Sequence, residues 1–161
     1  MPIDYSLYLV TDRSILKGRD ILKAVEDAIK GGVTLLQLRE KDISTADFYN
    51  LALKIKTLSK HYNIPLIIND RLDIALAIDA DGLHIGQDDM PIEVARKLIG
   101  KNKLLGYSVS NIKEAIYGEK NGADYLGAGP VYPTGSKADA GKPIGPDGLK
   151  LIKNNVSIPI V

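Results

Sequence analysis

The chain has 161 residues, 45% of them hydrophobic, and its 21 basic and 20 acidic side chains leave a net charge of +1. That length and composition suit a single domain over residues 1–161, and the mixed charge without a basic tract argues against nucleic-acid binding. The chain has no cysteine, no signal-peptide pattern and no apolar run near the ~20 residues of a membrane span, so we expect a cytoplasmic protein without disulfides, thiolate metal sites or membrane contact.

Apolar runs typical of buried strands alternate with amphipathic segments along the chain. The predicted strands lie near residues 7–11, 34–39, 65–70, 82–86, 103–109 and 124–131, with the start of a seventh at 158–161. The predicted helices lie near residues 19–31, 45–62, 71–79, 91–99, 111–121 and 146–154. The helical period is clear in the second of these helices, where five apolar side chains share one face: Phe48, Leu51, Ala52, Ile55 and Leu58.

Local signals predict where several of these helices begin and end. Helix starts are predicted at Asp20, Ser44, Pro91 and Asn111. A glycine follows three of the predicted helices, in residues 28–34, 77–82 and 119–124. We expect each of these glycines to supply the positive φ that ends its helix.

Strict alternation of strand and helix, without hairpin signals, predicts a parallel sheet. The sheet could be a closed barrel or an open doubly wound sheet. Residues 10–13 stand where a Gly-x-Gly-x-x-Gly turn would follow the first strand, and polar residues follow at least five strands. Both observations favour a (β/α)8 TIM barrel. The barrel would be incomplete, with six units and the start of strand seven, and about two units, on the order of 50 residues, would be missing.

Residues 37–41 place three donors at the end of the second predicted strand. In extended backbone Gln37, Arg39 and Lys41 share one side, while Leu38 and Glu40 point to the other. Arg39 offers a planar fork and Lys41 a point charge, which together suit a diphosphate. The alternative is a solvated strand end with Gln37 as a polar residue of the barrel interior.

Two carboxylates follow the next two predicted strands. Asp70 comes directly after Asn69, and Asp89 lies 19 residues further on, one unit of the repeat. Carboxylates at the ends of adjacent parallel strands can share a hard cation, with water and phosphate oxygens as its other ligands. The spacing therefore predicts a Mg2+ site, in which Asp88 competes with Asp89. The alternative is that Asp70 or Asp89 only caps the following helix.

Two further strand residues carry polar groups. Ser108 ends the fifth predicted strand, where its hydroxyl could donate to a phosphate or cap the next helix. His84 lies between Leu83 and Ile85 in the fourth strand. We interpret His84 as a buried structural imidazole, with a catalytic role as the alternative.

The longest connection of the chain runs from residue 132 to residue 148 and is rich in proline and glycine. Long loops at the active face of a barrel often close over or hold the substrate. Residues 134–137 carry two hydroxyls and a lysine, which suit a phosphate although the spacing is not that of a P-loop. The alternative is a disordered, solubilising loop.

Five motifs in order resemble those of the thiamine-phosphate synthase (thiamine-phosphate pyrophosphorylase) family. They are residues 37–41, 69–70, 86–89, 106–108 and 129–137, and the match runs along the whole chain. The resemblance implies a (β/α)8 barrel that joins hydroxymethylpyrimidine diphosphate to hydroxyethylthiazole phosphate in thiamine biosynthesis. Diphosphate is released with Mg2+ bound, and no covalent nucleophile is needed.

The resemblance also implies a role for each motif residue. The pyrimidine diphosphate would be held by Gln37, Leu38, Arg39, Glu40, Lys41, Asn69, Ser108 and Lys137. The thiazole phosphate would contact Thr134, Gly135 and Ser136, and the Mg2+ ligands would be Asp70 and Asp89 rather than Asp88. Those that would stabilise the departing diphosphate in catalysis are Arg39, Lys41, Ser108 and Lys137.

The chain departs from the family pattern at Ser110, where His is usual, and at Ser136, where a second Thr is usual. The family's other thiazole-phosphate contacts follow strands seven and eight and would lie beyond Val161. The complete gene product is therefore expected to be active, whereas the 161-residue chain alone could lack activity.

Two rival functions stay open at this point. One is a related thiazole tautomerase, against which the Asn69–Asp70 and Gln87–Asp89 motifs count. The other is a non-catalytic phosphate-binding fragment completed by a partner chain. A homo-oligomer is possible in either case, because an unclosed barrel exposes strand edges.

Overall fold

The computed structural model describes residues 3–135 and 141–161. The chain divides into two compact units, unit 1 with residues 1–83 and unit 2 with residues 84–161. Both are built from parallel strands alternating with helices, which is a partial TIM-barrel-like α/β fold. No helix among the described residues is long and apolar enough to span a membrane.

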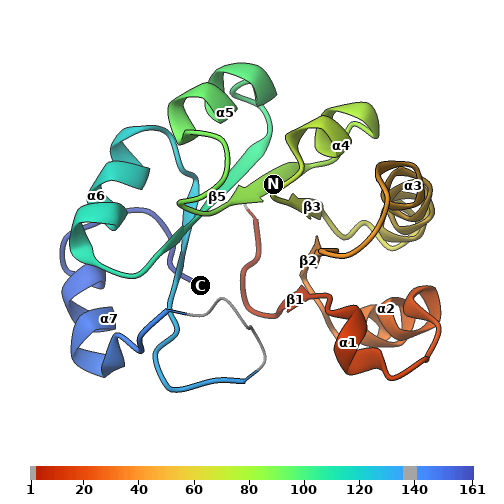
Figure 1. The fold of residues 1–161 in the computed structure, drawn as a ribbon, viewed down its shortest axis with the longest axis horizontal. Helices are drawn as coiled ribbons and strands as arrows, with labels where there is room; N and C mark the ends of the chain where they lie inside the picture. Colours follow the sequence, from red (N-terminus) through yellow and green to blue (C-terminus); the bar gives the residue numbers. More distant parts are fainter. Residues whose placement is uncertain (1–2, 136–140) are drawn as a thin grey trace. The chain divides into compact units, whose positions relative to one another are not determined.

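Unit 1 contains three strands in chain order, each followed by helix (Figure 1). Its elements are β1 (Tyr8–Val10), α1 (Arg13–Leu16), α2 (Ile21–Lys30), β2 (Leu35–Leu38), α3 (Thr45–His61), β3 (Leu66–Asn69) and α4 (Leu72–Ala77). β2 lies between β1 and β3 and pairs parallel with both. The paired register, Val10 with Gln37 and Leu38 with Ile68, brings the carboxyl ends of all three strands to one edge.

The core of unit 1 explains why its strands read as continuous apolar runs. Every residue of β2 and β3 is buried, as expected for parallel strands covered on both faces. The predicted apolar face of α3 supplies much of that cover through Phe48, Ala52 and Ile55, all buried.

Unit 2 repeats the same construction. β4 (Gly82–Ile85) begins in unit 1 and ends in unit 2. The other elements are α5 (Ile92–Ile99), β5 (Leu104–Val109), α6 (Ile112–Lys120), β6 (Tyr125–Ala128) and α7 (Gly145–Lys153). β5 and β6 pair parallel, with Ser108 opposite Gly127.

Most predicted elements are confirmed, with strands shorter than expected. The predicted strand over 124–131 ends at Ala128, and the predicted seventh strand forms only an isolated bridge between Leu126 and Ile160. α1 was not predicted. It is a single turn whose start is capped by Asp12, because the Asp12 carboxylate accepts a hydrogen bond from the Ser14 amide.

The predicted helix starts at Asp20, Ser44 and Asn111 are confirmed as side-chain caps. Pro91 also precedes its helix, without a side-chain cap. The prediction about glycines was partly wrong. After α2 and α6 the positive φ belongs to Gly32 and Gly122, but after α4 it belongs to Asp79, a residue type that tolerates this conformation.

Candidate functional site: strand ends of unit 1 and a cavity in unit 2

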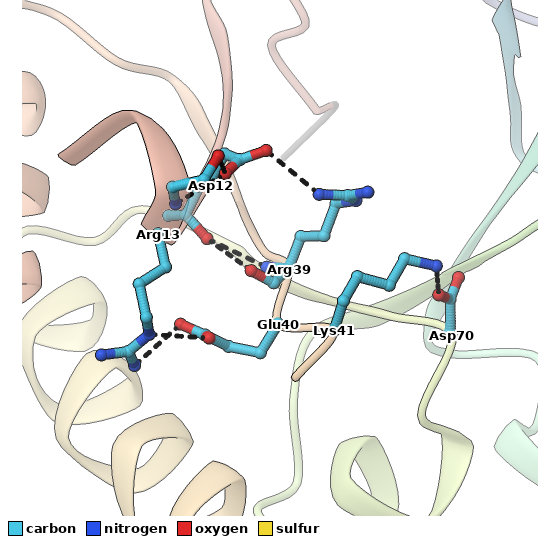
Figure 2. A network of polar contacts seen from close by, with 8 residues as sticks. Asp12, Arg13, Arg39, Glu40, Lys41 and Asp70 are labelled. Atoms are coloured by element: carbon cyan, nitrogen blue, oxygen red, sulfur yellow. Dashed lines mark hydrogen bonds and ion pairs between the residues drawn. The ribbon is translucent and has the colours of Figure 1, made fainter. Parts of the chain in front are cut away.

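In unit 1, the predicted diphosphate-binding residues extend from the carboxyl end of β2. Arg39 Nη1 donates to Asp12 Oδ2 at 3.2 Å, and Lys41 Nζ donates to Asp70 Oδ2 at 2.8 Å. Figure 2 shows both cations extending to one side of the backbone. The structure therefore brings Arg39, Lys41 and Asp70 of the predicted set together at one edge.

Glu40 extends to the opposite side, as the predicted alternation requires (Figure 2). Its carboxylate accepts two hydrogen bonds from the Arg13 guanidinium, each at 3.0 Å, and only 3% of the Glu40 side chain is exposed. This pairing raises the pKa of Arg13, chiefly through the hydrogen bond to Glu40. The Glu40 carboxylate thus anchors α1 to β2, and any contact of Glu40 with a ligand would have to come from its backbone.

The other predicted residues of β2 and β3 are buried. Gln37 Nε2 donates to Tyr8 Oη at 2.7 Å, so the amide is held between β1 and β2. The Leu38 side chain is completely buried, which leaves only its backbone for ligand contact. Asn69 is the last residue of β3 and is also buried.

Two residues after β1 belong to the same cluster and were not singled out from the sequence. Thr11 Oγ1 accepts from the Arg39 amide at 3.0 Å, and Asp12 pairs with the Arg39 side chain. A hydrogen bond from the Ser14 side chain holds the pKa of Asp12 below its ordinary value, and the charge of Arg39 acts in the same direction. Their place at the end of a predicted strand is the signal that could have identified them.

Neither predicted metal ligand caps a helix, so that alternative is wrong. α4 begins after Arg71 and α5 after Pro91, both without a side-chain cap. Asp70 has a positive φ of 61° directly after β3. In unit 2, Asp89 Oδ2 accepts from the Gly86 amide at 2.7 Å, which turns the carboxylate back to the end of β4, while Asp88 is exposed.

Ser108 lies in β5 and does not cap α6, whose cap is Asn111. Its hydroxyl is 2.9 Å from His84 Nε2, and its carbonyl accepts from Gln87 Nε2 at 2.8 Å. Gln87 in turn accepts from the Tyr107 hydroxyl at 2.9 Å. Burial raises the pKa of Tyr107, although the hydrogen bond to Gln87 opposes that shift.

A cavity of about 310 Å³ opens beside Ser108 within unit 2. It is lined by the ends of β5 and β6 and by the segment that follows β6, including Thr134. Gly135 is exposed in that segment. Ser136 and Lys137, also predicted as site residues, lie outside the described residues.

The predicted metal ligands, taken one by one, are of the type that a hard cation such as Mg2+ prefers. The two predicted ligands offer only carboxylate oxygens, the chain has no cysteine, and His84 is engaged with Ser108 and Tyr125. No group of three or more His, Asp or Glu side chains within residues 3–135 and 141–161 could hold a metal.

Comparison with known proteins places this arrangement in a family. The family described as "Thiamine monophosphate synthase" matches residues 7–161. Thiamine-phosphate synthases from Clostridium botulinum strain Hall and Desulfitobacterium hafniense are 58% and 56% identical to this chain over 161 residues, all of the chain and 78% of each relative.

Solved structures agree with the sequence comparison. Thiamine phosphate pyrophosphorylase from Pyrococcus furiosus superposes with a TM-score of 0.84 at 41% identity, over 96% of this chain and 72% of that one. An N-acetylmannosamine-6-phosphate 2-epimerase from Clostridium perfringens, with a TM-score of 0.64 at 16% identity over 96% of this chain and 73% of that one, shares the fold alone. The chain belongs to the thiamine monophosphate synthase family.

Proposed function

We propose that the protein is a transferase of thiamine biosynthesis that forms thiamine phosphate from a pyrimidine diphosphate and a thiazole phosphate. The observation that carries the proposal is the cluster at the strand ends of unit 1, where two cations each pair with a carboxylate, Arg39 with Asp12 and Lys41 with Asp70. Family membership and 58% identity to a thiamine-phosphate synthase over the full chain support the same activity.

In the proposed reaction the bond between the pyrimidine methylene carbon and the diphosphate oxygen breaks, and its electron pair leaves with diphosphate. The methylene carbon then bonds to the thiazole nitrogen, whose lone pair supplies the new bond. The aminopyrimidine ring can delocalise the positive charge that develops on the methylene. The protein's tasks are therefore to stabilise the leaving diphosphate and to position the thiazole.

The cations of unit 1 are suited to the first task. Arg39 is held by Asp12, which limits its rotamers and directs its guanidinium, and Lys41 supplies a point charge that is paired with Asp70. A preorganised donor of this kind is commonly worth about 10²–10³ in rate. Lys137 is proposed to add a third cation. Gln37 and Asn69 are proposed to contact the pyrimidine diphosphate through their side-chain amides.

In unit 2, Ser108 is proposed to donate to the diphosphate, and the cavity beside it to receive substrate. Thr134 lines this cavity and, with Gly135 and Ser136, is proposed to contact the thiazole phosphate.

Asp70 is the proposed Mg2+ ligand in unit 1 and Asp89 the proposed ligand in unit 2. When bound, Mg2+ would neutralise charge on the diphosphate and so make it a better leaving group. We also propose that the repeated units form part of a closed (β/α)8 barrel, which the parallel pairing in chain order supports.

The activity is tested by incubating the purified full-length protein with both substrates and Mg2+ and measuring thiamine phosphate and diphosphate. We expect equal amounts of the two products. Release of diphosphate without thiamine phosphate would show that the protein hydrolyses the pyrimidine diphosphate and does not transfer it.

A further inference from the structure

His84 connects a fully buried phenol to the hydroxyl of Ser108. Its Nδ1 lies 3.0 Å from Tyr125 Oη, and its Nε2 lies 2.9 Å from Ser108 Oγ. Only 7% of His84 and none of Tyr125 is exposed. Polar groups buried this deeply are costly unless their hydrogen bonds are made, so this row of three side chains restricts the geometry of each member.

The backbone around this row is built to admit an imidazole. A Cβ at Gly106 would lie 2.3 Å from His84 Nδ1 and 2.2 Å from Tyr125 Cζ. A Cβ at Gly127 would lie 3.1 Å from His84 Cε1. Gly106 is the register partner of Tyr125 and Gly127 that of Ser108, so one glycine on each of the paired strands β5 and β6 leaves room for the imidazole.

The main chain of Ser108 is fixed by a second, separate row. Tyr107 donates to Gln87, and Gln87 donates to the Ser108 carbonyl. With the backbone held from one side and the hydroxyl from the other, the remaining freedom of Ser108 is the direction of its single hydroxyl hydrogen.

That direction depends on the tautomer of His84. If Nδ1 carries the proton, it donates to Tyr125, and the Ser108 hydroxyl must donate to Nε2. Ser108 then offers a ligand only its lone pairs. If Nε2 carries the proton, it donates to Ser108, and the Ser108 hydrogen is available for an anion. A phenol with a pKa near 10 is a better donor than an aliphatic hydroxyl, so the bare imidazole nitrogen should face Tyr125.

We propose that His84 is a positioning residue for the transfer reaction: Tyr125 donates to its Nδ1, its Nε2–H donates to Ser108, and the Ser108 hydroxyl is thereby oriented as a donor to the leaving diphosphate. Only the last step of this inference, donation from Ser108 to the diphosphate, rests on the proposed function. The order of donors from Tyr125 to Ser108 is independent of it.

The order of donors is tested by ¹⁵N NMR of histidine-labelled full-length protein at pH 8, where an ordinary imidazole is neutral. The chain has two histidines, and the exposed His61 serves as an internal reference. We expect His84 to be the Nε2–H tautomer and Tyr125→Phe to populate the other tautomer. The control Tyr62→Phe, which removes a hydroxyl bonded to Glu26, should leave the His84 tautomer unchanged. An Nδ1–H tautomer in the unmodified protein would overturn the proposal, whether or not the protein makes thiamine phosphate.

The positioning role is tested by kinetics. Ser108→Ala and His84→Leu should each lower kcat about 10²–10³-fold with little change in KM, and Tyr125→Phe about tenfold. His84→Gln keeps an N–H donor and should recover part of the loss. Because His84 acts through Ser108, His84→Leu should cost less than threefold in the Ser108→Ala background.

The outcomes separate the claims. The proposal would be wrong if His84→Leu lowered kcat equally in the unmodified and the Ser108→Ala backgrounds and His84→Gln recovered none of the loss. His84 would then only support the fold. Absence of thiamine phosphate with the unmodified protein would count against the proposed function, while the tautomer measurement would still decide the order of donors.

Discussion

Lys41 Nζ lies 2.8 Å from Asp70 Oδ2, so the cation that follows β2 is paired with the carboxylate that follows β3. The Lys41 side chain is 44% exposed and that of Asp70 is 22% exposed. An ion pair this open to solvent contributes about 1 kcal/mol or less to stability. Breaking this pair would therefore cost little if, as proposed, Lys41 binds the diphosphate and Asp70 holds the metal.

Asp70→Asn should abolish turnover and leave the melting temperature nearly unchanged, because the pair it breaks stabilises the fold so little. Asp89→Asn in unit 2 should also abolish turnover, but the melting temperature should fall somewhat, because Asp89 Oδ2 accepts from the Gly86 amide. Turnover and thermal unfolding are measured on the same preparations. Asp27→Asn, which breaks an exposed pair with Lys23 on α2, is the matched control and should keep full activity. Substantial turnover by either site variant would remove that aspartate from the proposed metal site.

Arg39→Ala should lower kcat about 10²–10³-fold, the usual effect of one lost preorganised donor. Asp12→Asn keeps the guanidinium but weakens its anchor, so we expect a smaller loss of about tenfold, mainly in kcat. Steady-state rates with Lys30→Ala as the control for a lost surface cation would check both. An Asp12→Asn effect equal to that of Arg39→Ala would indicate that Asp12 contacts substrate itself.

The sequence predicted the strand-end clusters because a buried parallel strand ends abruptly at its first polar residues. Gln37, Asn69 and Asp70 were found in this way, and the alternation of Arg39, Glu40 and Lys41 was predicted correctly. The same rule could also have found Asp12. α1 was missed for a different reason, because a single turn is too short for a period of 3.6 residues to be recognised.

The row from Tyr125 to Ser108 could not be predicted from local pattern. His84 and Tyr125 are 41 residues apart, and their meeting depends on the register of β5 with β6 and on the space left by Gly106 and Gly127. The sequence did predict that the imidazole is buried, which is confirmed. It could not predict its partners, because pairing between side chains of different strands has no signature in either strand alone.

Two aspartates hold equivalent places in the repeat and should have equivalent effects on stability. Asp81 accepts from the Leu66 amide and from Lys56, and Asp124 accepts from the Leu105 amide and from Arg96. Asp81→Asn and Asp124→Asn should each lower the free energy of unfolding by about 1–3 kcal/mol, since the negative charge that strengthens these hydrogen bonds is removed. Urea unfolding measures this effect, and no change in either variant would show that water replaces the carboxylate.

The segment after α7 should loosen in acid. Glu119 accepts from the Ser157 hydroxyl and amide and from the Ile158 amide, and these hydrogen bonds lower its pKa below the ordinary value of 4.5. A lowered folded pKa means that the stabilisation is present above pH 4.5 and is lost as the pH falls through the folded pKa.

The protection of the Val161 amide, its exchange rate relative to the intrinsic rate at the same pH, should therefore fall at low pH, because this amide donates to Leu126 of β6. In Glu119→Gln the neutral amide no longer titrates, so this pH dependence should flatten. An unchanged pH profile in Glu119→Gln would place the acid-sensitive group elsewhere.

In the proposed function, a divalent metal and the pyrimidine diphosphate are bound together by residues that include Lys41 and Asp70. Carboxylates alone would supply too few ligands to hold a bare Mg2+ firmly, so we expect binding of the metal to depend on phosphate oxygens. The most direct test is calorimetric titration of the full-length protein with pyrimidine diphosphate, with Mg2+ present or with excess chelator. We predict binding that requires Mg2+ and that is lost in Asp70→Asn. Equally tight binding in excess chelator would contradict coupled binding of the metal and the diphosphate.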